Sequence, residues 1–241
     1  MKKYKLFGER NSGTNLVKYL LDQDNFYRDD VEFSEIKILN KIISIIGTKF
    51  PQSYDFIYDH LKYKKTLEIL GWKHSYPDKE TIKKFNAIPV LIVRHPKFWK
   101  ESFTKYPFHH YGAEKYKFRK IENSSIKKID IDELIFSKYK SYINLSNSLK
   151  CVIIQYETLI KYFEEIKIIL TNIFGHCQNL PEKEARKFIK DKNTNYLKKL
   201  DSSRLVILDN LNKDLFIKYK KELNFFGYEE QNWKKLKPFI S

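Results

Sequence analysis

Residues 3–16 read Lys-Tyr-Lys-Leu-Phe-Gly-Glu-Arg-Asn-Ser-Gly-Thr-Asn-Leu, and this stretch predicts a strand, a tight loop and the start of a helix. The β-type run covers residues 3–7, the loop lies between Gly8 and Gly13, and apolar residues then recur at helical spacing. Gly13 has no Cβ, so the backbone there can approach an anion closely. The unpaired N–H groups at the start of a helix also favour negative charge. We therefore expect the loop to bind an anionic group such as a phosphate.

The loop also carries side chains that can donate hydrogen bonds to an anion, namely Arg10, Ser12, Thr14 and Asn15. Its two glycines have the spacing of a Walker-type loop, but Thr14 and Asn15 stand where that loop has Lys and Ser or Thr. Without the lysine that reaches the β- and γ-phosphates, an ordinary nucleoside triphosphatase or kinase is disfavoured. The alternative is a strand-to-helix turn that needs a glycine and a cap and binds nothing.

The composition indicates one folded domain. A chain of 241 residues with 42% hydrophobic and 16% aromatic residues can bury a core of its own. We expect a single domain over residues 1–241, with insertions around 24–65 and 106–128 that contribute the acceptor site or a lid. Cys151 and Cys177 do not make a disulfide framework, and Cys151 begins an apolar run that is expected to be buried.

The net charge of +16, from 46 Lys and Arg against 30 Asp and Glu, favours anionic ligands. Lysines on solvated faces would give the same total without any partner, and the cations are not confined to one predicted helix. We therefore expect no specific nucleic-acid partner. The sequence shows no signal-type apolar region and no apolar run long enough to span a membrane, so we expect a soluble, cytoplasmic protein. The sequence does not predict the oligomeric state.

Strands and helices alternate along the chain, which predicts an α/β fold of three layers with a central parallel sheet flanked by helices. Beyond the first strand, strands are expected at 66–72, 89–93 and 151–154. Helices are expected at 14–22, 79–85, 96–104, 132–145, 182–189 and 211–225, together with a long one that follows Glu157 and ends at Phe174. Residues 36–46 fit either a strand or a buried helix, and residues 106–128 fit a loop or lid rich in aromatic and cationic side chains.

Polar residues follow each predicted strand, at the edge where ligands bind to parallel sheets. Lys73 and His74 follow the second strand. Arg94 follows the third, with Ser102 eight positions later. Ser102 would lie about two turns into the next helix, where it could bind the same phosphate as Arg94. Tyr156-Glu157-Thr158-Leu159 follows the fourth strand.

This ordered set resembles the sulfotransferases that use 3′-phosphoadenosine 5′-phosphosulfate (PAPS). That family has a Lys-(Ser/Gly)-Gly-Thr loop at a strand–helix junction, a strand ending in arginine with a serine eight residues later, and a later Tyr-Glu-x-Leu segment. Here Ser12-Gly13-Thr14, Arg94 with Ser102, and Tyr156-Glu157-Thr158-Leu159 match in type, order and spacing within residues 3–175. The resemblance implies a P-loop-like sulfotransferase fold and transfer of a sulfuryl group from PAPS to a hydroxyl of a sugar or glycan, with no metal required.

The same resemblance implies the roles of the donor-binding residues. Those that would hold the 5′-phosphosulfate are Arg10, Asn11, Ser12, Gly13, Thr14 and Asn15. Arg94 and Ser102 would hold the 3′-phosphate, and Tyr156 would contact the adenine region.

His74 is the predicted general base, because imidazole titrates near neutrality and the family often places a histidine after this strand. The alternative is that His74 only forms hydrogen bonds within its loop, with Glu9 or Glu157 as the base. Lys73 or Arg10 would stabilise the leaving phosphate.

Two features depart from the family. Asn11 stands where the family has a lysine, with Arg10 before it as in the glycan-modifying branch. The C-terminal Arg-Lys-Gly loop of the small-molecule enzymes has no counterpart, so the resemblance is closer to bacterial and glycan-modifying members. Two other functions stay open. One is a same-fold transferase of a phosphoryl-type group from another nucleotide donor, and the other is a basic nucleic-acid-binding protein without catalysis.

Overall fold

The computed structural model describes residues 3–9, 12–21, 74, 76–77, 79–84, 86–105, 118–122, 125–129, 131–182, 185 and 217–228. The expected strand at 66–72 and the segments 24–65 and 36–46 lie outside these residues, as do most of 182–189, the first part of 211–225, and the site residues Arg10, Asn11 and Lys73.

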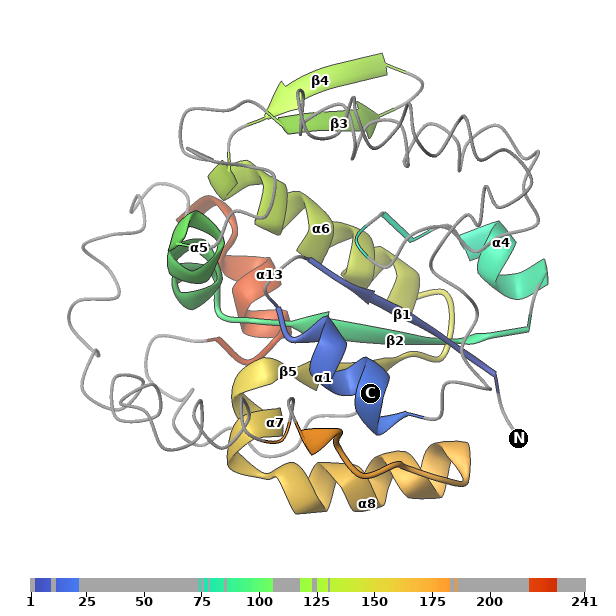
Figure 1. Cartoon of the computed structure of the whole chain (residues 1–241). Coiled ribbons are helices and arrows are strands. Elements are labelled where there is room, and N and C mark those ends of the chain that lie inside the picture. The colour runs from blue at the N-terminus through green and yellow to red at the C-terminus, as the bar shows by residue number, and fades with distance from the viewer. Residues whose placement is uncertain are drawn as a thin grey trace, which may run out of the picture.

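A parallel sheet of three strands lies at the centre of the described structure (Figure 1). Its strands, in the order β1-β2-β5, are β1 (Tyr4–Gly8), β2 (Ile88–Val93) and β5 (Val152–Gln155). The register pairs Gly8 with Ile92 and Val93 with Gln155, so the carboxyl ends of all three strands lie at one edge. The strands are buried almost throughout, as expected for continuous apolar runs in a parallel sheet.

Helices pack on both faces of this sheet, because successive side chains of a strand point to opposite faces. Phe7, Leu91 and Ile153 face one layer, and Leu6 and Ile92 face the other. The helices of the first layer are α4 (Lys79–Lys84), α5 (Pro96–Lys105), α6 (Ile131–Ser146) and α13 (Lys220–Phe225). Those of the second are α1 (Thr14–Leu20), α7 (Tyr156–Lys161) and α8 (Phe163–Phe174). The expected α/β fold, with helices flanking a parallel sheet, is confirmed for the described residues (Figure 1).

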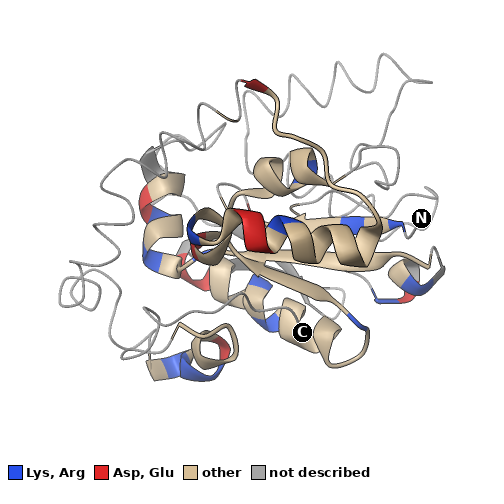
Figure 2. Ribbon diagram, turned by 90° about the horizontal axis from the view of Figure 1, so that it is seen from below, with Lys and Arg blue, Asp and Glu red and all other residues tan. Residues whose placement is uncertain are grey.

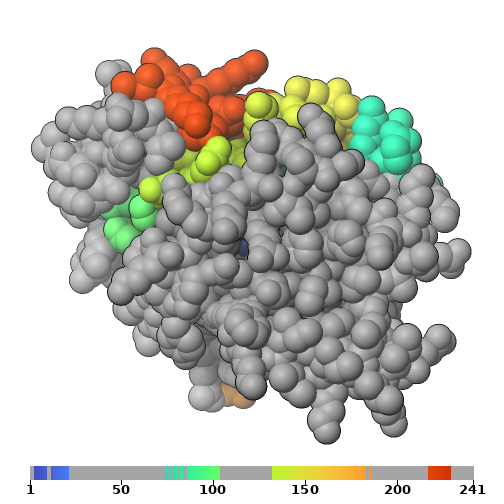
Figure 3. Space-filling view, turned by 90° about the horizontal axis from the view of Figure 1, so that it is seen from above, coloured from blue at the N-terminus to red at the C-terminus, as the bar shows by residue number. Residues whose placement is uncertain are grey.

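The first layer is tied together by side chains of α6. The Lys100 ammonium on α5 lies 2.7 Å from Asp132 Oδ1 at the start of α6. The Phe136 ring of α6 stacks on Tyr219, just before α13, with ring centres 4.3 Å apart. In the space-filling view α13 lies along α6 at one border of the molecule (Figure 3).

Part of the expected loop at 106–128 is instead a pair of antiparallel strands, which corrects the prediction. The strands are β3 (Phe118–Glu122) and β4 (Ser125–Ile129). Within each strand the apolar residues are three positions apart, so neither shows the alternation that predicts a half-buried strand. The register places Phe118 opposite Ile129 and Ile121 opposite Ile126. The apolar residues therefore form pairs across the two strands and no alternating pattern along either one.

The long helix expected to end at Phe174 is also different, because two helices meet at Tyr162. The backbone of Tyr162 has φ −120° and ψ 47°, outside the helical region, although its N–H still donates to the Thr158 carbonyl at 2.7 Å. Residues 156–160 are all buried, whereas α8 buries only one stripe of its surface. The break therefore joins a helix that is buried all round to an amphipathic helix.

Both cysteines are free thiols, and both are buried, as expected for Cys151. Burial raises the pKa of the Cys151 thiol to about 12, so it packs as a small apolar residue. Among the described helices, none combines the length and the apolar character needed to cross a membrane.

Candidate functional site

Three segments that follow β1, β2 and β5 come together at the carboxyl edge of the sheet. Gly13, in the loop after β1, has φ +94°, a left-handed conformation that glycine adopts without strain. A Cβ at this position would lie 2.3 Å from Cδ2 of Tyr156, the first residue after β5. The absence of a side chain at position 13 thus lets the Tyr156 ring pack directly on the loop.

Arg94, the first residue after β2, lies over the same Tyr156 ring. Its guanidinium carbon is 4.7 Å from the centre of the Tyr156 ring, in a cation–π contact. The backbone of Arg94 is held by Tyr139 of α6, whose hydroxyl accepts a hydrogen bond from the Arg94 N–H at 3.0 Å and donates one to the Arg94 carbonyl. The structure therefore brings Gly13, Arg94 and Tyr156 into one contiguous group.

The loop after β1 differs from expectation in the donors that it offers. Both the N–H and the hydroxyl of Ser12 donate to the Glu9 carbonyl, at 3.1 and 2.5 Å, so they close the turn. Gly13 caps α1 without any side-chain hydrogen bond. Within the described part of the chain, the N–H groups of Gly13 and Thr14 have no acceptor, and Asn15 is exposed. The donors that the loop can offer to an anion are thus the backbone N–H groups of Gly13 and Thr14.

Ser102 lies about two turns into α5, as expected, and is half-buried. Arg94 stands two residues before the same helix. Within the described residues the two side chains make no direct hydrogen bond, which the predicted sharing of one phosphate does not require. Trp99, on the same helix, is fully buried in the core.

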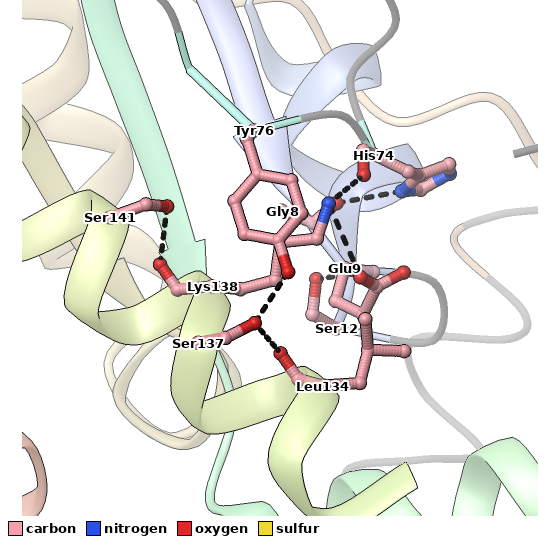
Figure 4. Close-up of polar contacts among 9 residues, drawn as sticks. All are labelled: Gly8, Glu9, Ser12, His74, Tyr76, Leu134, Ser137, Lys138 and Ser141. Atoms are coloured by element: carbon pink, nitrogen blue, oxygen red, sulfur yellow. Dashed lines mark hydrogen bonds and ion pairs between the residues drawn. The ribbon is translucent and has the colours of Figure 1, made fainter. Parts of the chain in front are cut away.

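A second cluster of polar residues lies where the segment that holds His74 meets β1 and α6 (Figure 4). The His74 Nδ1 lies 2.6 Å from the Gly8 carbonyl, and because a carbonyl only accepts, Nδ1 carries the proton. The neutral imidazole then has its lone pair on Nε2. This is the tautomer that a general base acting through Nε2 requires.

Lys138 of α6 is at the centre of this group, and the sequence analysis did not identify it. Its ammonium donates to the His74 carbonyl at 2.6 Å and lies 3.8 Å from Glu9 Oε2. It also lies 3.8 Å from the centre of the Tyr76 ring. Helical spacing gave a signal that could have found it, since Lys138 is four residues from both Leu134 and Tyr142, on the apolar side of α6.

Glu157, considered as an alternative base, is instead an anchor within the core. It is 4% exposed and accepts hydrogen bonds from the His95 N–H at 2.9 Å and the Tyr228 hydroxyl at 2.8 Å. Burial raises the pKa of its carboxyl above the ordinary value of 4.5. The carboxyl links the turn after β2 to the segment after α13, where the Gln155 amide also donates to the Phe226 carbonyl.

His95, the residue before Pro96, is buried against Tyr228 and Phe98. Burial, and then the nearby Lys97 charge, lower the pKa of His95 to about 3, so the imidazole is neutral near pH 7. This histidine is therefore part of the packing of the turn.

The cations of the described residues lie on several helices and strands, with acidic residues between them (Figure 2). No group of three His, Cys, Asp or Glu side chains that could hold a metal ion occurs within the described part of the chain. No protein-family model matches the chain, and no curated protein is significantly similar to it.

Proposed function

We propose that this protein is a sulfotransferase of the P-loop-like type, which transfers a sulfuryl group from PAPS to a hydroxyl of a sugar, glycan or related acceptor. The observation that supports the proposal is the contact of Gly13, Tyr156 and Arg94. These residues come from three different motifs of the resemblance, and they adjoin one another at the ligand-binding edge of the sheet.

On the donor side, Arg94 is assigned to the 3′-phosphate of the nucleotide. An arginine presents fixed donors that suit a phosphate, and the Tyr139 hydroxyl limits the movement of its backbone. Ser102 is assigned as a second donor from α5, and the Tyr156 ring is assigned to the adenine region. The backbone N–H groups of Gly13 and Thr14 are assigned to the 5′-phosphosulfate.

On the acceptor side, His74 is assigned as the base. The acceptor hydroxyl gives its proton to Nε2 of His74 while its oxygen forms a bond to the sulfur of PAPS. The bond between this sulfur and the bridging oxygen breaks, and adenosine 3′,5′-bisphosphate leaves with the electron pair. Arg10 or Lys73 is assigned to stabilise the negative charge on the departing phosphate. Catalysis is then mainly positioning and electrostatic stabilisation.

The experiment that tests the function compares nucleotide ligands by titration calorimetry. Adenosine 3′,5′-bisphosphate, the product of the proposed reaction, is titrated beside ATP with magnesium and beside duplex DNA. We expect selective binding of the bisphosphate. A preference for ATP with magnesium would instead indicate phosphoryl transfer. Steeply salt-dependent binding of DNA alone would indicate the nucleic-acid-binding alternative.

A further inference from the structure

Lys138 occupies an unusual place for a lysine, because its side chain is 3% exposed at the junction of three elements. A buried ammonium is costly unless charged or polar groups surround it. Here the surrounding groups are the Glu9 carboxylate after β1, the His74 carbonyl and the Tyr76 ring. Each of them belongs to a segment that adjoins the proposed site.

The neighbouring residue on α6 holds the same segment. The Ser137 hydroxyl is hydrogen-bonded to the Tyr76 hydroxyl and also donates to the Leu134 carbonyl at 3.0 Å. Two consecutive residues of one helix thus fix both described ends of the segment 74–76, one through its backbone and one through its side chain (Figure 4).

His74 is consequently held at two of its polar groups. Its carbonyl accepts from Lys138 at 2.6 Å, and its Nδ1–H donates to the Gly8 carbonyl at 2.6 Å. A hydrogen bond to one ring nitrogen determines which nitrogen carries the proton of a neutral histidine. If the His74 backbone moved, the ring would lose its hydrogen bond to the Gly8 carbonyl. That bond is what favours the proton on Nδ1 over Nε2.

We propose that Lys138 is the positioning residue for His74: by binding the His74 carbonyl, it keeps Nδ1 protonated against Gly8 and leaves Nε2 as the basic nitrogen. The Glu9 carboxylate keeps the ammonium in place at 3.8 Å. Lys138 acts through His74 and does not itself touch the donor. This role rests on the proposed function only in calling His74 the base, because the tautomer can be measured without any ligand.

The test is a long-range ¹H–¹⁵N spectrum of the labelled full chain at a pH where its imidazoles are neutral, with His74 assigned by its absence in a His74→Asn variant. Wild-type His74 is expected to show a protonated Nδ1 and an unprotonated Nε2. In Lys138→Met this signature is expected to be lost and replaced by a mixture that includes protonated Nε2. The matched control is Lys100→Met, which removes a lysine of α5 that is paired with Asp132 of α6. This variant should leave the His74 signature unchanged.

Lys138→Met removes the Lys138 cation from beside the buried Glu9 carboxylate, so this variant can fail to fold. The double variant Glu9→Gln/Lys138→Met removes both charges and still lacks the donor to His74, so it should show the same loss. The proposal is overturned if wild-type His74 carries its proton on Nε2, or if the double variant keeps the wild-type signature. It is also overturned if the double variant keeps its fold but loses the wild-type affinity for adenosine 3′,5′-bisphosphate, since Lys138 would then belong to the donor side. Failure of the wild type to bind this nucleotide would count against the proposed function alone.

Discussion

The guanidinium carbon of Arg94 lies 4.7 Å from the centre of the Tyr156 ring, and this contact joins the segments that follow two neighbouring strands of the sheet. The same ring packs on Gly13 in the loop after β1. Because these three residues form one packed group, the effects of substitutions at them should not be additive.

Gly13→Ala should destabilise the protein through both backbone strain and a clash. A Cβ there would lie 2.3 Å from Tyr156 Cδ2, and φ is +94°. Gly175→Ala is the matched control, since Gly175 also has a positive φ of +89° but has open space where a Cβ would stand. We expect the free energy of unfolding to fall about 1–3 kcal/mol further for Gly13→Ala than for Gly175→Ala, from overpacking alone. Equal losses in urea denaturation would show that the Tyr156 ring does not pack on position 13.

Tyr139→Phe should weaken nucleotide binding without removing any group that contacts the nucleotide. The change removes the Tyr139 hydroxyl from the Arg94 N–H and carbonyl, so Arg94 is held less firmly in position. We therefore expect affinity for adenosine 3′,5′-bisphosphate to fall about tenfold, which corresponds to about 1.4 kcal/mol. Tyr142→Phe is the control, because the buried Tyr142 hydroxyl has no hydrogen-bond partner among the residues described. Calorimetry that gave both variants the wild-type affinity would exclude a role for Tyr139 in holding Arg94.

Glu157 should make stability depend on pH in a predictable direction. Because burial raises its pKa above 4.5, the folded protein holds this proton more tightly than the unfolded chain. Its contribution to stability is therefore complete below pH 4.5 and is lost as the pH rises through the raised pKa. In Glu157→Gln this part of the pH dependence should disappear, as measured by the free energy of unfolding in urea across the range. A curve parallel to that of the wild type would mean that Glu157 ionises as freely in the fold as outside it.

His95 should make stability depend on pH in the opposite direction to Glu157. Its pKa falls from 6.5 to about 3 on folding, so the unfolded chain takes up this proton first as the pH drops. The stability associated with the neutral imidazole is present above pH 6.5 and is lost progressively as the pH approaches 3. NMR titration of the assigned His95 ring should find it neutral at pH 5. A midpoint near 6.5 would contradict its burial against Tyr228.

The elements at the centre of the fold could be predicted from the sequence, because their signals are local. Residues 89–93 form a continuous apolar run, and β2 covers Ile88–Val93. The helix expected at 132–145 is α6, Ile131–Ser146. The pair β3 and β4 could not be predicted in this way, because their apolar residues match only across the two strands.

The candidate site was predictable in part for the same reason. Gly13, Arg94 and Tyr156 each follow a strand, so the topology of a parallel sheet brings them together. Lys138 was missed because it stands in the middle of a helix, and lysines at such positions are usually solvated. Its role depends on contacts with Glu9 and His74, which are more than 60 positions away in the sequence.

The most direct test of the account measures what the 3′-phosphate contributes to binding, and whether Arg94 provides that contribution. Wild-type protein, Arg94→Ala and Lys83→Ala are each titrated with adenosine 3′,5′-bisphosphate and with 5′-AMP. Lys83 is a half-exposed lysine on α4, so its loss controls for the change in net charge. We expect the wild type and Lys83→Ala to prefer the bisphosphate by about 1.5–3 kcal/mol, the usual contribution of hydrogen bonds to charged groups, and Arg94→Ala to lose this preference. Equal affinity of the wild type for the two nucleotides, or an unchanged preference in Arg94→Ala, would contradict the proposed site.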